Sequence, residues 1–102
     1  MQTPNDYLRE LLLELASEAG LSDSAIARAH NRAHEDSTLA ASTVQRFREG
    51  TPTEGTPPSR LMEEAYAVAT GTTREANWDE AFKRWRANRT DSAGRSLRRR
   101  SA

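Results

Sequence analysis

The chain has no cysteine and little glycine or proline. Without cysteine it has no disulfide framework, no thiol nucleophile and no cysteine-based zinc site. No uninterrupted apolar run approaches the length of a membrane span, and charged side chains between Asp6 and Glu14 interrupt any signal-peptide core. No glycine-rich phosphate loop or nucleophile motif is present. We therefore expect a small cytoplasmic protein that is not an enzyme and carries no cofactor.

The composition indicates one domain with a thin core. The chain has 102 residues, of which 35% are hydrophobic, and its mean hydropathy is −0.87. Its net charge of zero hides a segregation of charge. Residues 1–82 carry seven arginines against fourteen acidic residues, whereas residues 83–102 carry eight basic residues against Asp91 alone. The sequence thus predicts an acidic body with a basic end.

Helical spacing dominates, and no segment alternates like a strand, so we expect an all-α fold. A first helix is predicted from Pro4, capped by Thr3 and ended by Gly20. Its predicted buried stripe is Leu8, Leu11, Leu12, Leu15 and Ala19. Glu10, Glu14 and Glu18 form a separate acidic face. That face should point away from any nucleic acid.

Two further helices are predicted in the middle of the chain. One begins at Ser22 or Asp23 and runs to about His34 or Glu35. The next covers roughly 41–49, with Val44 and Phe47 inward. Residues 51–58 are rich in proline, glycine and threonine, which predicts a loop.

The last two helices are predicted after this loop. The fourth begins near Ser59 and stops at Gly71, and its predicted buried residues are Leu61, Met62, Ala65, Val68 and Ala69. The fifth starts near Thr72 or Asn77, because both positions have the spacing of a capping box. Beyond residue 88 we expect a disordered basic tail over 89–102, which leaves 1–88 as the domain.

The segment Leu39–Gly50 carries the most specific signal. It reads Leu-Ala-Ala-Ser-Thr-Val-Gln-Arg-Phe-Arg-Glu-Gly, which resembles the recognition helix of the phage-repressor (XRE or lambda-repressor-type) helix-turn-helix family. Ile26-Ala27 resembles the start of that family's second helix, and 57–71 resembles its fourth. The resemblance covers about residues 8–71 and implies a five-helix domain. An apparent insertion near 32–38 lengthens the second helix.

This resemblance implies a sequence-specific transcriptional regulator, of repressor type, that binds double-stranded DNA as a homodimer without a small-molecule ligand and is nucleoid-associated. The helix at 41–49 would lie in the major groove, which admits an α-helix. The predicted base-reading residues are Ala41, Ser42, Thr43, Gln45 and Arg46. The predicted phosphate contacts are Arg28, Arg32, Arg48, Thr51, Thr53, Arg95, Arg98, Arg99 and Arg100. The arginines at the end of the chain have a second reading, as a solubilising terminus.

An aromatic face on the fifth helix leaves another function open. Trp78, Phe82 and Trp85 share this face, and large aromatics suit either a core or a dimer contact. The alternative function is a protein-interaction module, antitoxin-like or a phage-encoded adaptor, that uses these three residues to bind its partner.

The sequence holds two histidines at helical spacing, a pattern that could suggest a metal site. His30 and His34 lie one helical turn apart, but a stable zinc site needs a third ligand. Arg28 and Arg32 beside them would repel a cation. We therefore predict that His30 and His34 are exposed helix residues and that they bind no metal ion.

Overall fold

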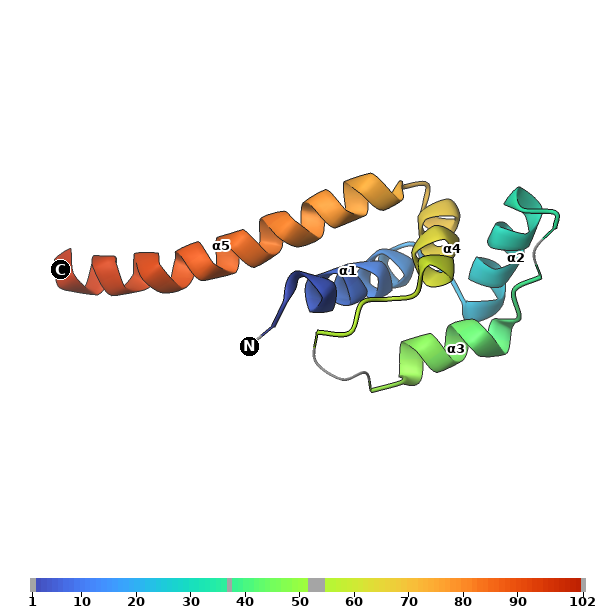
Figure 1. Cartoon of the computed structure of the whole chain (residues 1–102), viewed down its shortest axis with the longest axis horizontal. Coiled ribbons are helices and arrows are strands. Elements are labelled where there is room, and N and C mark those ends of the chain that lie inside the picture. Colours follow the sequence, from blue (N-terminus) through green and yellow to red (C-terminus); the bar gives the residue numbers. More distant parts are fainter. Residues whose placement is uncertain (1, 37, 52–54, 102) are drawn as a thin grey trace.

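The computed structural model describes the backbone of residues 2–36, 38–51 and 55–101, and side chains as far as residue 88. These residues form five helices and no strand, so the all-α prediction is confirmed. The helices are α1 (Pro4–Glu18), α2 (Asp23–Ala33), α3 (Ala41–Glu49), α4 (Arg60–Thr70) and α5 (Arg74–Ser101). In Figure 1, α1 to α4 gather into one body, and α5 lies along α1 and extends past it. None of these helices, within the described residues, is long and apolar enough to cross a bilayer.

The start of α1 anchors the loop that joins α3 to α4. Asp6 accepts hydrogen bonds from the backbone N–H of Thr3 at 2.8 Å and from that of Gly55 at 2.9 Å. The side chain of Asn5 donates to the Gly55 carbonyl at 2.8 Å. The bond from the Thr3 backbone, outweighing partial desolvation, lowers the pKa of Asp6 below its ordinary value of 3.8. A capping box on α1 therefore also fixes a segment about fifty residues away in sequence.

The core draws a few side chains from every helix. Tyr66 of α4 is 0% exposed and lies among the buried side chains of this cluster. Phe47 of α3 packs edge-on against it, with ring centroids 5.4 Å apart. Val44 is fully buried, so both inward residues predicted on α3 face the core. The other buried apolar members are Leu8, Leu12, Ala16, Ile26, Ala27, Leu39, Met62, Ala65 and Ala81.

The predicted buried face of α4 is partly wrong. Leu61 and Val68 were expected in the core, but they are 37% and 39% exposed. Tyr66 and Ala67 are buried instead. Residues 65–69 are apolar all round the helix, so periodicity does not select a face. On α1, similarly, Ala16 is buried whereas the predicted Ala19 is exposed.

The fifth helix continues where the sequence predicts disorder. It is capped by Thr73, whose hydroxyl accepts from the Ala76 N–H at 3.1 Å. It then runs without a break to Ser101, so the backbone over 89–101 is helical and the predicted disordered tail is corrected. The segment contains no proline, and its five arginines with Ala93 and Leu97 are good helix formers that offset weak ones such as Gly94. Figure 1 places its end far from α3, along the molecule's 57 Å long axis.

Candidate nucleic-acid interface

The connection between α2 and α3 sets the geometry of any helix-turn-helix. Ser22 caps α2 by accepting from the Ala25 N–H at 3.1 Å, as predicted. The helix ends at Ala33, slightly earlier than expected, and residues 34–40 lead to α3. The apparent insertion near residues 32–38 therefore contributes partly to the last turn of α2 and partly to the connection between α2 and α3.

Asn31 braces that connection. Its side-chain amide donates to the Leu39 carbonyl at 3.0 Å and accepts from the Leu39 N–H at 2.7 Å. Leu39 itself is 4% exposed and belongs to the core. The end of the connection is thus held both by a paired backbone and by a buried side chain. This bracing fixes where α3 begins, although seven residues separate it from α2.

Arg9 of α1 holds the other end of α3. Its Nη2 donates to the carbonyl of Phe47 at 3.0 Å and to that of Gly50 at 2.8 Å. Its guanidinium also lies over the Phe47 ring, 5.4 Å from the centroid. The last carbonyls of a helix have no partner within the helix, and a cation there opposes the negative end of the helix dipole. Sequence reasoning gave Arg9 no role, because its partners lie about forty residues away.

The outward side of α3 carries most of the predicted base-reading residues. Ser42, Gln45 and Arg46 are exposed. Gln45 donates to both Glu49 carboxylate oxygens at 3.3 Å, and Arg46 Nε donates to the Ser42 carbonyl at 3.4 Å. These local contacts lie at the surface, so water or another polar partner can replace them.

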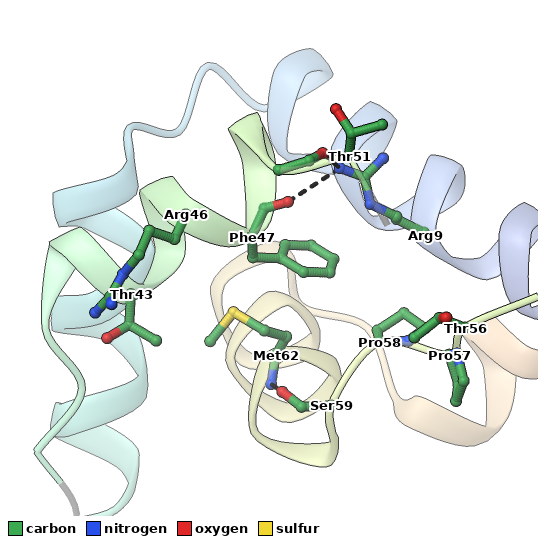
Figure 2. A pocket seen from close by; sticks show the side chains of 11 residues that line it. Arg9, Thr43, Arg46, Phe47, Thr51, Thr56, Pro57, Pro58, Ser59 and Met62 are labelled. Atoms are coloured by element: carbon green, nitrogen blue, oxygen red, sulfur yellow. Dashed lines mark hydrogen bonds between the residues drawn. The ribbon is translucent and has the colours of Figure 1, made fainter. Parts of the chain in front are cut away.

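Two of the predicted base-reading residues lie elsewhere. Ala41 is half-buried and packs against the core, which corrects its outward placement. Thr43 is half-buried beside a hollow of about 380 Å³ between α3 and the start of α4. In Figure 2, Thr43 and Arg46 lie on one side of this hollow, and Pro58 and Met62 lie on another. The exposed surface of α3 is therefore narrower than the sequence suggests.

Arg48 is already paired within the protein. Its Nε and Nη2 donate to the two Asp23 carboxylate oxygens at 3.0 and 2.9 Å. This hydrogen-bonded pairing with Asp23 raises the pKa of Arg48 above its ordinary value. Because the bidentate pair joins α2 to α3, a phosphate contact by Arg48 would have to compete with Asp23. Arg28 and Arg32, by contrast, are exposed on α2.

The structure describes the remaining predicted phosphate-contact residues to different extents. Thr51 is exposed and lines the hollow beside α3. Thr53 lies outside the described residues. For Arg95, Arg98, Arg99 and Arg100 only the backbone is described, as part of α5. In Figure 1 the backbone of that part of α5 projects away from α3.

The three aromatic side chains of α5 differ in their surroundings. Trp78 packs against the core, and its indole N–H donates to the buried carboxylate of Glu63. Phe82 lies next to Trp78, with ring centroids 5.8 Å apart, but it is 40% exposed. Trp85 is half-buried. The predicted aromatic face is thus part core and part surface.

Glu14, on the acidic face of α1, pairs with Arg84 of α5. Arg84 donates to Glu14 through Nη1 at 2.9 Å and to Glu80 through Nε at 2.9 Å. The hydrogen bond from Arg84 lowers the pKa of Glu14, and the two carboxylates raise the pKa of Arg84. Arg84 therefore helps to hold α5 on α1, and the basic character counted from residue 83 lies mainly further along the helix.

Comparisons with protein families, with curated proteins and with solved structures found no match.

Proposed function

We propose that the protein is a sequence-specific DNA-binding regulator, with α3 in the major groove of double-stranded DNA. The observation that carries the proposal is the way α3 is held. Its inner side is buried through Val44, its start is fixed through Leu39, and its end is capped by Arg9. The opposite side remains exposed. A rigidly positioned helix with one open polar side is what groove recognition requires.

The exposed side chains suit base recognition. An arginine pairs bidentately with guanine, and a glutamine pairs with adenine. Arg46 and Gln45 are adjacent, and both are bound only to groups of α3 itself in the described structure. The resemblance of residues 39–50 to the phage-repressor recognition helix points the same way. It also supports a homodimer on an inverted repeat as the binding form.

Phosphate contacts are assigned by exposure and charge. Arg28 and Arg32 on α2 are the first candidates, because they are exposed and close in sequence to the connection with α3. The basic end of α5 is a second, separate source of charge. Phosphate contacts position a protein without reading sequence, so these two groups should add affinity to any duplex.

The test is selection of duplexes from a random pool, followed by a mobility shift on the recovered site. Arg46→Ala should lose about 1–3 kcal/mol on that site and little on random DNA. Arg86→Ala is the matched control, because it removes one exposed arginine from α5. Failure to enrich any sequence, or equal behaviour of the two variants, would refute base recognition by α3.

Self-association through α5 is a separate proposal, which concerns the contact that would form the homodimer. The observation in its favour is Phe82, a large apolar ring that is 40% exposed beside Trp78. We propose that this ring contacts a second copy of the chain, because aromatic residues are enriched at interface centres. Phe82→Glu should then lower the apparent mass in solution while the far-ultraviolet circular dichroism stays unchanged. A mass that is independent of this substitution would exclude the contact.

A further inference from the structure

Three side chains able to bind a metal ion meet between α2 and α4. His30 lies in the last turn of α2, and His34 follows directly after it. Their rings are 4.6 Å apart between centroids and tilted by 33°. Glu64 of α4 supplies a third group, and one ligand atom from each residue lies within 4.8 Å of the other two. The fold thus brings a third candidate ligand, Glu64, to the histidine pair.

The innermost of these residues has unused binding capacity. His30 is not exposed as predicted, because α2 packs against α4: it is 2% exposed, and its Nδ1 is buried without a hydrogen-bond partner among the described residues. Buried polar atoms are paired in the great majority of cases, and an exception calls for a functional or structural reason. His34 is exposed and Glu64 is half-buried, so an ion can reach the group from solvent.

We propose that His30, His34 and Glu64 bind a divalent transition-metal ion, and that zinc fits them best. Two imidazoles and one carboxylate suit zinc, whereas magnesium and calcium prefer oxygen ligands throughout. Zinc–ligand bonds of about 2.0–2.2 Å require the three ligand atoms to approach to roughly 3.3 Å from one another. The ligand atoms already lie within 4.8 Å of one another, so binding would require side-chain rotation of the exposed His34 and the half-buried Glu64. The fourth position is then open to water.

Neighbouring arginines do not prevent binding. Arg60 donates to Glu64 at 3.1 Å, but its side chain is 76% exposed, so this ion pair is weak and easily exchanged. Arg28 and Arg32 are exposed, so solvent and salt screen their repulsion of a cation. The ion would join the last turn of α2 to α4, directly before the connection that leads to α3. The site goes beyond the proposed DNA binding and does not depend on it.

The test uses the full chain without a histidine tag, stripped with a chelator and then titrated with zinc chloride. Zinc at a hundredfold excess over its dissociation constant should raise the midpoint of thermal unfolding by about 10 °C or more. Cobalt(II), a spectroscopic substitute, should give visible absorption typical of low coordination number. The chain holds no cysteine and two histidines, so a rival site with nitrogen or sulfur ligands is hard to build.

Two variants assign the ligands. His34→Gln and Glu64→Gln should each fold and lose most of the zinc-dependent shift and of the cobalt absorption, because both positions reach the surface. Glu18→Gln removes an exposed carboxylate of α1 and should keep both signals. An unresponsive wild-type protein, or equal responses in all three variants, would overturn the proposal. Neither result involves DNA, so neither bears on the proposed function.

Discussion

Asn31 and Leu39 exchange two hydrogen bonds, 3.0 and 2.7 Å long, across the connection between α2 and α3. The side-chain amide of Asn31 satisfies both backbone hydrogen-bonding groups of the buried Leu39, its N–H and its carbonyl. The connection is long, yet Leu39, two residues before the start of α3, is fixed. Asn31 thus helps to position the start of α3, whereas Arg9 holds its other end.

Asn31→Ala should lower the free energy of unfolding by about 1–3 kcal/mol, because the buried Leu39 N–H loses its acceptor. For a domain of this size each kcal/mol corresponds to roughly 4–8 °C in the thermal midpoint. Hydrogen exchange at the Leu39 amide should accelerate as well. Asn88→Ala, at an exposed position of α5, is the control. Unchanged protection at Leu39 would contradict the brace.

Arg9→Lys keeps the charge of Arg9 but loses the guanidinium, whose Nη2 donates to the Phe47 and Gly50 carbonyls and whose plane lies over the Phe47 ring. We expect a loss of about 1–3 kcal/mol in unfolding free energy, since the last carbonyls of α3 lose charged donors. Urea denaturation measures it. Arg28→Lys at an exposed position of α2 is the matched control and should be nearly neutral. Equal stability of both variants would show that Arg9 does not cap α3.

Asp23→Asn should release Arg48 from its bidentate partner. If the protein binds DNA through α3, affinity for selected and random duplexes should rise together, because a freed arginine adds a phosphate contact. The slope of log K against log salt should grow by about one unit. Asp79→Asn removes the same charge from an exposed position of α5 and serves as control. An identical slope for both variants argues that Arg48 stays away from the duplex.

Tyr66 should make the fold sensitive to alkali. Burial raises the pKa of its hydroxyl from 10.0 to about 12. The folded state holds this proton more tightly than the unfolded state does. The free energy of unfolding is therefore highest below pH 10 and falls as the pH rises to about 12. The loss is about 1.4 kcal/mol per pH unit, or roughly 2–3 kcal/mol in total.

Tyr66→Phe isolates this effect. It removes a buried hydroxyl that has no described hydrogen-bond partner, so stability at neutral pH should hold or rise by up to about 1 kcal/mol. The alkaline loss assigned to Tyr66 should disappear. Tyr7→Phe, at the other tyrosine, should retain it. Denaturant unfolding at several pH values gives the comparison, and parallel curves for wild type and Tyr66→Phe would contradict it.

Truncation after Asn88 should leave the thermal midpoint nearly unchanged, since Ala81 is the last core residue and Trp85 the last half-buried one among the described side chains. Its effect on DNA binding should depend on duplex length. The molecule is 57 Å long, which corresponds to roughly 17 base pairs at about 3.4 Å each. The basic end, far from α3, should therefore add salt-sensitive affinity on a duplex of about 30 base pairs and not on one of about 12. Equal loss on both would place these arginines near α3.

The sequence by itself determined the local features of this protein. Thr3, Ser22 and Ser59 begin helices as predicted, and Gly71 ends α4 in the left-handed conformation at φ 70°. The bounds of α3 match the prediction as well. These signals act within about four residues of the chain, through caps and backbone torsions. They can therefore be predicted from the sequence without knowledge of the tertiary structure.

Tertiary structure alone decided which of these side chains meet. Nothing in the spacing of Asn31 and Leu39 marks them as partners, and Glu64 is thirty residues from His34. The choice of Tyr66 over Val68 for the core likewise depended on how α4 packs against the other helices. Such contacts follow from the burial of several helix faces at once, a property of the whole assembly that no single segment encodes.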